Sequence, residues 1–235
     1  MSRRKKLSER TANEIKDIAR RLMAEKGTAG LSIRAIAREI EMTPPAIYTY
    51  FPSLDDLITA LILDAFNAYA DTLEAARDAA AENGASLAEQ LVVVSLAYRT
   101  WAVEHPAQFK LIYGSPIPGY HAPREVTVPA VTRTGAVFMG IVFEMWARGE
   151  APLPTSLGVP PTVTNHIERF IPPEVDPVPG AVDGVYELYS HWTHLHGMVT
   201  LEVFGHLQGT VGDVEAFYRH EVQRIYQQMG IAVSA

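Results

Sequence analysis

The chain has 235 residues, of which 48% are hydrophobic, and its formal net charge is -7. Such a length and composition predict a well-filled hydrophobic core, in one large domain or in a small domain followed by a larger one. The sequence contains no cysteine, which excludes disulfide frameworks, thiol nucleophiles and thiolate metal sites and fits a reducing cytoplasm.

The N-terminal segment combines a basic run with one predicted helix. Arg3, Arg4, Lys5 and Lys6 are followed by polar residues instead of the apolar stretch of a secretory signal peptide, so we expect a cytoplasmic protein. Residues 14–26 then carry apolar side chains at helical spacing, and a glycine follows as a typical stop. Two interpretations of the basic run stay open: a solvated tail, and an arm that lies along a nucleic acid.

The next segment predicts two short helices joined by a tight turn. Ser32 is a suitable N-cap for a helix whose apolar residues, at positions 33–40, recur at helical spacing. After a three-residue turn, capped by Thr43, a second helix begins at Pro44, because proline suits a first helical turn. Ile47 and Phe51 lie one turn apart and face inward. This layout is typical of a helix-turn-helix, whose second helix enters the DNA major groove.

The same segment resembles the N-terminal domain of the TetR family of transcriptional regulators. The matching residues are Gly27, Leu31, Ser32, Ile33, Arg34, Ala35, Ile36, Ala37, Met42, Thr43, Pro44, Ile47, Tyr48, Tyr50, Phe51 and Leu57. The resemblance implies an all-α fold, with a basic arm and helix-turn-helix domain in residues 1–53 and a helical effector-binding and dimerisation domain in residues 54–235. The family often places a phosphate-binding lysine where this chain has Leu54, so that contact is missing here.

The charge distribution agrees with a DNA-binding N-terminus. Residues 1–62 contain 11 lysines and arginines against 8 acidic residues, whereas residues 63–235 contain 9 against 19. Because phosphates attract the first part and repel the second, we expect the acidic remainder to face away from DNA.

We expect the DNA contacts to come from the basic run, the outer side of the first short helix and the second short helix. The candidate residues are Arg3, Arg4, Lys5, Lys6, Ser32, Arg34, Thr43, Pro44, Pro45, Ala46, Tyr48, Thr49 and Tyr50. The two tyrosines are placed to reach phosphates, unless one of them packs in the core. Arg34 is expected at a guanine edge or a phosphate, or else in solvent, and Thr49 is the second expected polar contact to bases. The two prolines lack amide donors and leave an apolar tip.

The remaining chain predicts further helices over residues 54–81, 87–104, 106–113, 124–148, 183–207 and 213–229. A proline-rich loop over residues 150–180 lies between the fourth and fifth of these, with one helical turn near residues 166–171. The first of the two final helices has apolar residues on two sides, one for its own domain and one for a second subunit, which favours a four-helix interface built from both final helices in a homodimer. The residues Trp192, His196 and Gly197 also resemble a segment of one C-terminal subgroup of the family.

Aromatic residues of the second part are candidates for the wall of an effector pocket, with a plain hydrophobic core as the alternative. They are joined by one methionine, and the set is Phe66, Tyr69, Tyr98, Trp101, Phe109, Tyr113, Phe138, Met139, Phe143, Trp146 and Trp192. They would suit a small apolar or aromatic effector. The spacing of His191, His194 and His196 favours packing or hydrogen bonding over a metal site, and no catalytic motif or cofactor site emerges.

Together these features predict a cytoplasmic transcriptional repressor that binds a palindromic double-stranded DNA operator as a dimer. A ligand would release the dimer from the operator. An activator, or a regulator without an effector, is the first alternative. An all-helical carrier or enzyme with a vestigial DNA-binding head is the second.

Overall fold

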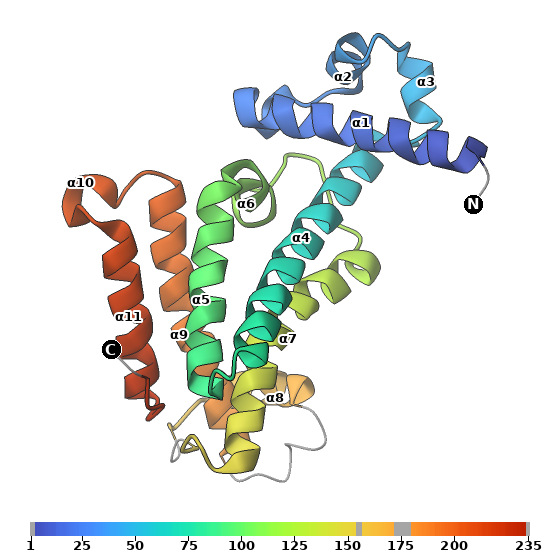
Figure 1. Ribbon diagram of the computed structural model, residues 1–235. Helices are drawn as coiled ribbons and strands as arrows, with labels where there is room; N and C mark the ends of the chain where they lie inside the picture. Colours follow the sequence, from blue (N-terminus) through green and yellow to red (C-terminus); the bar gives the residue numbers. More distant parts are fainter. Residues whose placement is uncertain (1–2, 154–156, 172–179, 234–235) are drawn as a thin grey trace. The chain divides into compact units, whose positions relative to one another are not determined.

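The computed structural model describes residues 3–153, 157–171 and 180–233, and every regular element in these ranges is a helix. The all-α prediction is therefore confirmed. The elements, labelled in Figure 1, are α1 (Arg3–Lys26), η1 (Thr28–Gly30), α2 (Ile33–Glu39), α3 (Pro44–Tyr48), α4 (Leu54–Glu82), α5 (Leu87–Glu104), α6 (Pro106–Tyr113), α7 (Arg124–Arg148), α8 (Pro161–Ile167), η2 (Glu168–Phe170), α9 (Ala181–Val203), α10 (Gln208–Val211) and α11 (Val214–Gln228).

Side-chain caps fix several of these helix starts. Before α4, the Ser53 hydroxyl accepts from the Asp56 amide at 3.0 Å. Before α5, the Glu89 carboxylate accepts from the Ser86 amide at 2.8 Å, which completes a capping box. Before α11, Asp213 accepts from the Ala216 amide at 2.9 Å. These local bonds explain why the sequence alone located the helices closely.

The chain forms two compact units, Met1–Tyr69 with Glu104–Thr132, and Ala70–Val103 with Arg133–Ala235. The core of the first unit joins buried residues of α1 to α4 with Leu111 of α6 and Ala130 of α7. The compact unit thus extends past the predicted boundary at residue 53, because Leu57 and Leu61 of α4 belong to this core. The functional boundary between residues 53 and 54 remains a prediction.

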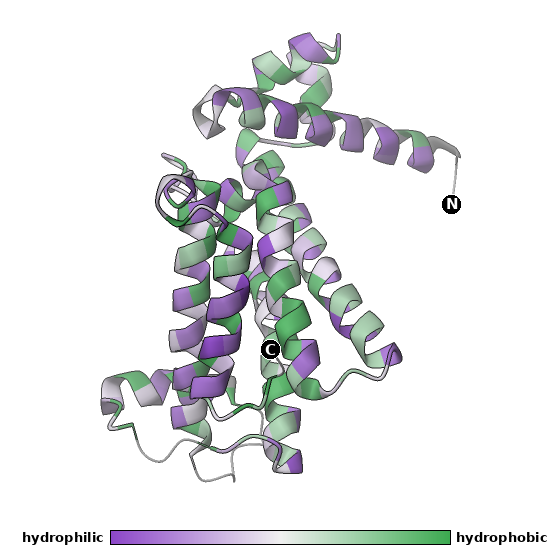
Figure 2. Ribbon diagram, turned by 60° about the vertical axis from the view of Figure 1, so that its left-hand side comes forward, coloured by the Kyte–Doolittle hydropathy of each residue, from purple (hydrophilic) through white to green (hydrophobic). Residues whose placement is uncertain are grey.

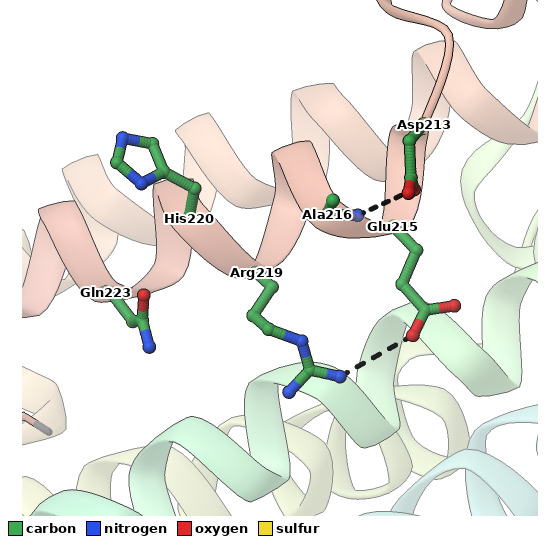
Figure 3. Close-up of a pocket in the computed structure, with 6 residues that line it drawn as sticks. All are labelled: Asp213, Glu215, Ala216, Arg219, His220 and Gln223. Carbon is green, nitrogen blue, oxygen red and sulfur yellow. Dashed lines mark hydrogen bonds and ion pairs between the residues drawn. The ribbon is translucent and has the colours of Figure 1, made fainter. Parts of the chain in front are cut away.

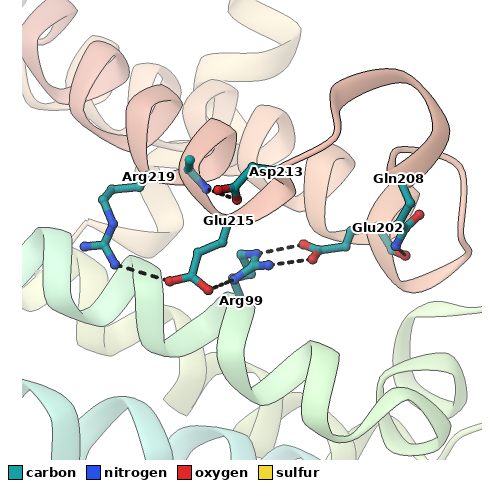
Figure 4. A network of polar contacts seen from close by, with 7 residues as sticks. Arg99, Glu202, Gln208, Asp213, Glu215 and Arg219 are labelled. Carbon is teal, nitrogen blue, oxygen red and sulfur yellow. Dashed lines mark hydrogen bonds and ion pairs between the residues drawn. The ribbon is translucent and has the colours of Figure 1, made fainter.

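The second unit is organised around α5, which is buried along most of its length. Its polar side chains hold the two C-terminal helices. The Ser95 hydroxyl lies 2.6 Å from the Tyr226 hydroxyl of α11. Arg99 forms a bidentate ion pair with Glu202 of α9, with hydrogen bonds of 2.8 and 2.6 Å. Its guanidinium also lies 3.5 Å from the carboxylate of Glu215 of α11 (Figure 4). Buried polar bonds therefore fix α9 and α11, which run side by side in Figure 1, against α5.

Several elements differ from the sequence-based predictions. The helix α1 begins at Arg3, so the backbone of the basic run is the start of a helix, which the sequence did not predict. Its contact with a nucleic acid remains a prediction. The helical turn predicted near residues 166–171 begins earlier, at Pro161, and the short α10 was not predicted. The helix α9 ends at Val203 and not at residue 207, with Phe204 as its C-cap. Lysine, arginine and glutamate are good helix formers, which explains how α1 extends without apolar periodicity.

One described helix, α7, is long and apolar enough to cross a membrane by length and composition. Arg133, near the middle of α7, pairs with Asp71 and Glu74 of α4, and Thr127 and Thr134 are buried. Ion pairs and buried threonines of this kind are typical of a helix packed within a folded domain.

Candidate nucleic-acid interface

The helix-turn-helix is anchored by residues that point into the core of the first unit. Ile33, Ile36 and Ala37 of α2 are buried, and the Ser32 hydroxyl accepts from the Ala35 amide at 3.2 Å, as predicted for an N-cap. In the turn, Glu41 adopts a left-handed backbone with φ 57°. The turn brings α3 back against the same core, where half-buried Met42 packs.

The helix α3 is held by its inner side and presents the rest outward. Ile47 is fully buried and Phe51 nearly so. Thr43, Pro44, Pro45, Tyr48 and Thr49 are exposed, whereas Ala46 and Tyr50 are half-buried. Tyr50 packs against the core of the first unit, so of the two tyrosines Tyr48 is the more accessible.

The hydroxyl groups of Thr43 and Thr49 differ from our expectation in the hydrogen bonds that they form. The Thr43 side chain forms no cap bond with α3, contrary to expectation. The Thr49 hydroxyl donates to the carbonyl oxygen of Ala46 at 2.7 Å. Its proton is therefore already engaged within the helix, and a threonine so bonded offers a DNA base only a methyl group and an acceptor oxygen. The role of Thr49 as a polar contact to bases remains a prediction.

The cations of residues 5–62 fall into two groups. Arg10, Lys16, Arg20 and Arg21 form ion pairs; Lys16 and Arg20 of α1 both bind Asp64 of α4, the first at 2.8 Å. A second group is exposed and forms no ion pair or side-chain hydrogen bond within the described ranges; it comprises Lys5, Lys6, Lys26, Arg34 and Arg38. The second group is available to phosphates, and Arg34 lies on the outer side of α2.

The basic N-terminal residues form the first turns of α1, before the part of this helix that packs against the core. Residues 5–10 are all exposed, and the first fully buried side chain is that of Ile15. Figure 2 shows α1 as a largely hydrophilic helix. The backbone of Arg3 and Arg4 is helical, and the exposed Lys5 and Lys6 follow on the same element.

The predicted effector-pocket residues are distributed over separate clusters in the two units. In the first unit, the Tyr113 ring lies 5.9 Å from Phe66 and 5.3 Å from Phe109. In the second unit, Phe143 and Trp146 lie 5.5 Å apart. Tyr69, Tyr98 and Trp101 are almost fully buried, and Phe138 and Met139 are half-buried. Their role in binding an effector remains a prediction.

Trp192 differs from the other pocket candidates because its indole is 37% exposed. Its ring stacks on His196 at 4.8 Å, and His196 Nδ1 lies 2.6 Å from the Tyr98 hydroxyl of α5. Burial lowers the pKa of His196, so a neutral imidazole is favoured in this stack. The other two histidines of α9 contact carboxylates: His194 lies 3.2 Å from Glu221, and His191 lies 3.7 Å from Glu187. Among the described residues, no three side chains gather as a metal site.

Surface depressions on α11 and on the helix-turn-helix unit are not lined by the predicted aromatic residues. The first lies on α11 and is lined by Asp213, Glu215, Ala216, Arg219, His220 and Gln223 (Figure 3). The second lies in the first unit and is lined by Glu14, Asp17, Ile18, Glu39, Ile40 and Glu41. Most of the residues that line them have charged or polar side chains, which does not fit the small apolar or aromatic effector that the sequence predicts.

Both the N-terminal and the C-terminal part of the chain match known protein families. Residues 15–61 match the family described as bacterial regulatory proteins, tetR family, and residues 91–225 match the tetracyclin repressor-like C-terminal domain. The HTH-type transcriptional regulators Rv1816 of Mycobacterium tuberculosis and Mb1846 of Mycobacterium bovis are each 35% identical over 205 residues, covering 87% of this chain and 86% of theirs.

Solved structures have the same fold. The crystal structure of the regulatory protein SCO4313 aligns with a TM-score of 0.73 and 30% identity, covering 96% of this chain and 100% of that one. The TetR family regulator PfmR of Thermus thermophilus aligns with a TM-score of 0.57 at 16% identity, over 91% of this chain and 97% of that one. The second likeness concerns the fold alone.

Proposed function

The chain belongs to the TetR family of DNA-binding transcriptional regulators, and we propose that it is a dimeric repressor released from a palindromic operator by a small apolar or aromatic effector. The observation that carries the proposal is the helix-turn-helix, anchored by Ile47 and Phe51, whose exposed side carries accessible hydroxyls and the unpaired Arg34. We expect it to act in the cytoplasm, where its DNA is.

The dimer would form through an aromatic face on the two C-terminal helices. We use this term for the large apolar residues of this region that are 36–44% exposed: Tyr186, Tyr189, Trp192, Leu201, Phe204 and Phe217. Gly197 lies among them on α9, and a Cβ added there would meet no atom within 4 Å. Exposed aromatic residues are typical of protein interfaces, and a second copy is the partner that a palindromic operator requires.

Two-fold symmetry then sets the geometry of the DNA. Two identical heads would enter major grooves one helical turn apart, roughly 34–36 Å, or a multiple of that distance. An effector can release the protein only in so far as it binds the DNA-incompatible arrangement more tightly. The helix α4 runs from the helix-turn-helix unit into the second unit without a break, and it is our candidate for the element that transmits the change.

Footprinting on the DNA that flanks the chain's own gene tests the proposal. We expect one protected palindrome, with protection lost as an effector from a screen of apolar and aromatic compounds is added. Random DNA of equal length and base composition is the control for specificity. Protection that spreads evenly over the control DNA would contradict an operator, and activation of transcription on binding would contradict a repressor.

The exposed lysines at the start of α1 should contribute to affinity through phosphates. Replacing Lys5 and Lys6 by alanine is expected to weaken operator binding and to reduce the slope of log affinity against log salt by about 0.9 for each phosphate that the variant no longer neutralises. Fluorescence anisotropy over a salt series measures the slope.

A double variant in the second unit, Arg77→Ala with Arg148→Ala, serves as the control for a general change in charge. It removes the same number of cations far along the sequence from the helix-turn-helix, and its slope should match that of the unaltered protein. An unchanged slope in the lysine variant would mean that the first turns of α1 do not touch the DNA.

A further inference from the structure

We propose that this chain recognises its operator mainly through the methyl groups of thymine. The contacting surface is the apolar first turn of α3, which consists of Pro44, Pro45 and Ala46 and which we call the proline surface. The proposal rests on the proposed function, because it concerns the bases that α3 meets once the protein is bound to DNA.

The first argument is the set of side chains on α3 and its flanks. Residues 43–50 contain no asparagine, glutamine, arginine, lysine, aspartate or glutamate. These are the side chains that form paired hydrogen bonds with guanine or adenine, or accept from cytosine, in the major groove. Pro44 and Pro45 also lack an amide hydrogen. Only hydroxyl groups remain as polar contacts on this segment.

The second argument is that one of these four hydroxyls already forms a hydrogen bond, and another belongs to a half-buried ring. Thr49 donates its proton to the Ala46 carbonyl at 2.7 Å, and Tyr50 packs against the core. Thr43 and Tyr48 stay exposed. A long tyrosine side chain suits a phosphate, which positions the protein but carries no sequence information. Thr43 is thus the one short, accessible hydroxyl beside the proline surface.

The third argument concerns what the proline surface can bind. The 5-methyl group of thymine is the apolar feature of the major groove, and it pairs with apolar side chains. Both prolines are exposed, and their rings hold the backbone at a fixed φ. A rigid apolar surface loses little conformational entropy on contact. The neighbouring helix α2 carries the exposed Arg34. An arginine can bind a guanine with two hydrogen bonds.

The test uses the footprinted operator and replaces each thymine of the half-sites singly by uracil. Uracil removes the methyl group and leaves the hydrogen-bonding edges unchanged. We expect a loss of about threefold to tenfold in affinity at one or more thymines of each half-site, the size expected for one buried methyl group. Restoring a methyl by placing 5-methylcytosine where cytosine replaces a sensitive thymine should recover part of the loss.

A protein variant links the effect to the proline surface. Pro44→Ala with Pro45→Ala shortens both side chains at positions where alanine fits a helix, and the uracil effect should shrink in this variant. Arg34→Ala is the matched control: it should weaken binding but leave the uracil effect unchanged. Affinity changes below twofold at every half-site thymine, or half-sites without thymine, would overturn the inference while specific binding still supported the proposed function. Loss of any preference over random DNA would instead contradict the proposed function itself.

Discussion

Gly197→Glu is expected to leave each subunit folded, to convert the dimer into a monomer, and to weaken operator binding by at least about 100-fold. Inside the subunit, the added side chain meets no atom within 4 Å of its Cβ, and replacing glycine within a helix favours the folded state by about 0.5–1 kcal/mol. In the proposed interface the same carboxylate would be buried without a partner, which costs several kcal/mol. Analytical ultracentrifugation and operator titration measure the two effects.

Gly140→Glu provides the matched control. Gly140 also lies within a helix, α7, and its added Cβ likewise meets no atom within 4 Å. This variant should remain dimeric and bind the operator normally. Circular dichroism confirms that both variants are folded. A Gly197→Glu protein that stays dimeric at micromolar concentration, with unaltered operator affinity, would show that the aromatic face is not the interface.

Arg99→Met is expected to lower the free energy of unfolding by about 3–5 kcal/mol, because it leaves a buried carboxylate without its partner. Glu202 is 8% exposed, and both of its carboxylate oxygens accept from Arg99. Burial alone would lower the pKa of Arg99, but the hydrogen bonds and the charge of Glu202 raise it, so Arg99 is charged in the folded protein. Urea denaturation at equal subunit concentration measures the loss.

A second substitution separates the loss of the arginine from the cost of the unpaired acid. Arg99→Met with Glu202→Leu should recover most of the stability, because an apolar pair of similar volume replaces the ion pair. Arg148→Met, which removes an exposed pair with Glu144, should cost less than about 1 kcal/mol. A double variant as unstable as the single one would mean that Arg99 acts through packing and not through the charge of Glu202.

The sequence predicted the packing of the helix-turn-helix because its signals are local, although the expected Thr43 cap does not form. The Ser32 cap, the inward Ile47 and Phe51, and the core contact of Met42 all depend on neighbours within a turn or two. The same local signals carry the resemblance to the TetR family, which the comparisons with known proteins confirm. The helical state of the basic run was missed, since it contains no apolar period to indicate a helix before Ile15.

Long-range packing was less predictable. Nothing in the spacing of residues 95–99 shows that Ser95, Tyr98 and Arg99 bond to α9 and α11, more than 90 positions later in the sequence. The same limit applies to the pocket candidates. Aromatic content indicated a core or a pocket, but which rings meet depends on the tertiary arrangement, and Trp192 proved more exposed than the other two tryptophans.

The stacking of Trp192 on His196 gives the protein an intrinsic optical probe. Of the three tryptophans, Trp101 and Trp146 are buried, and Trp192 alone presents a substantial part of its ring to solvent. Emission that acrylamide or iodide quenches therefore comes mainly from this one indole. Since Trp192 belongs to the aromatic face, diluting the protein through its dissociation range should increase that quenchable fraction. The association of the unlabelled subunits can then be followed by light alone.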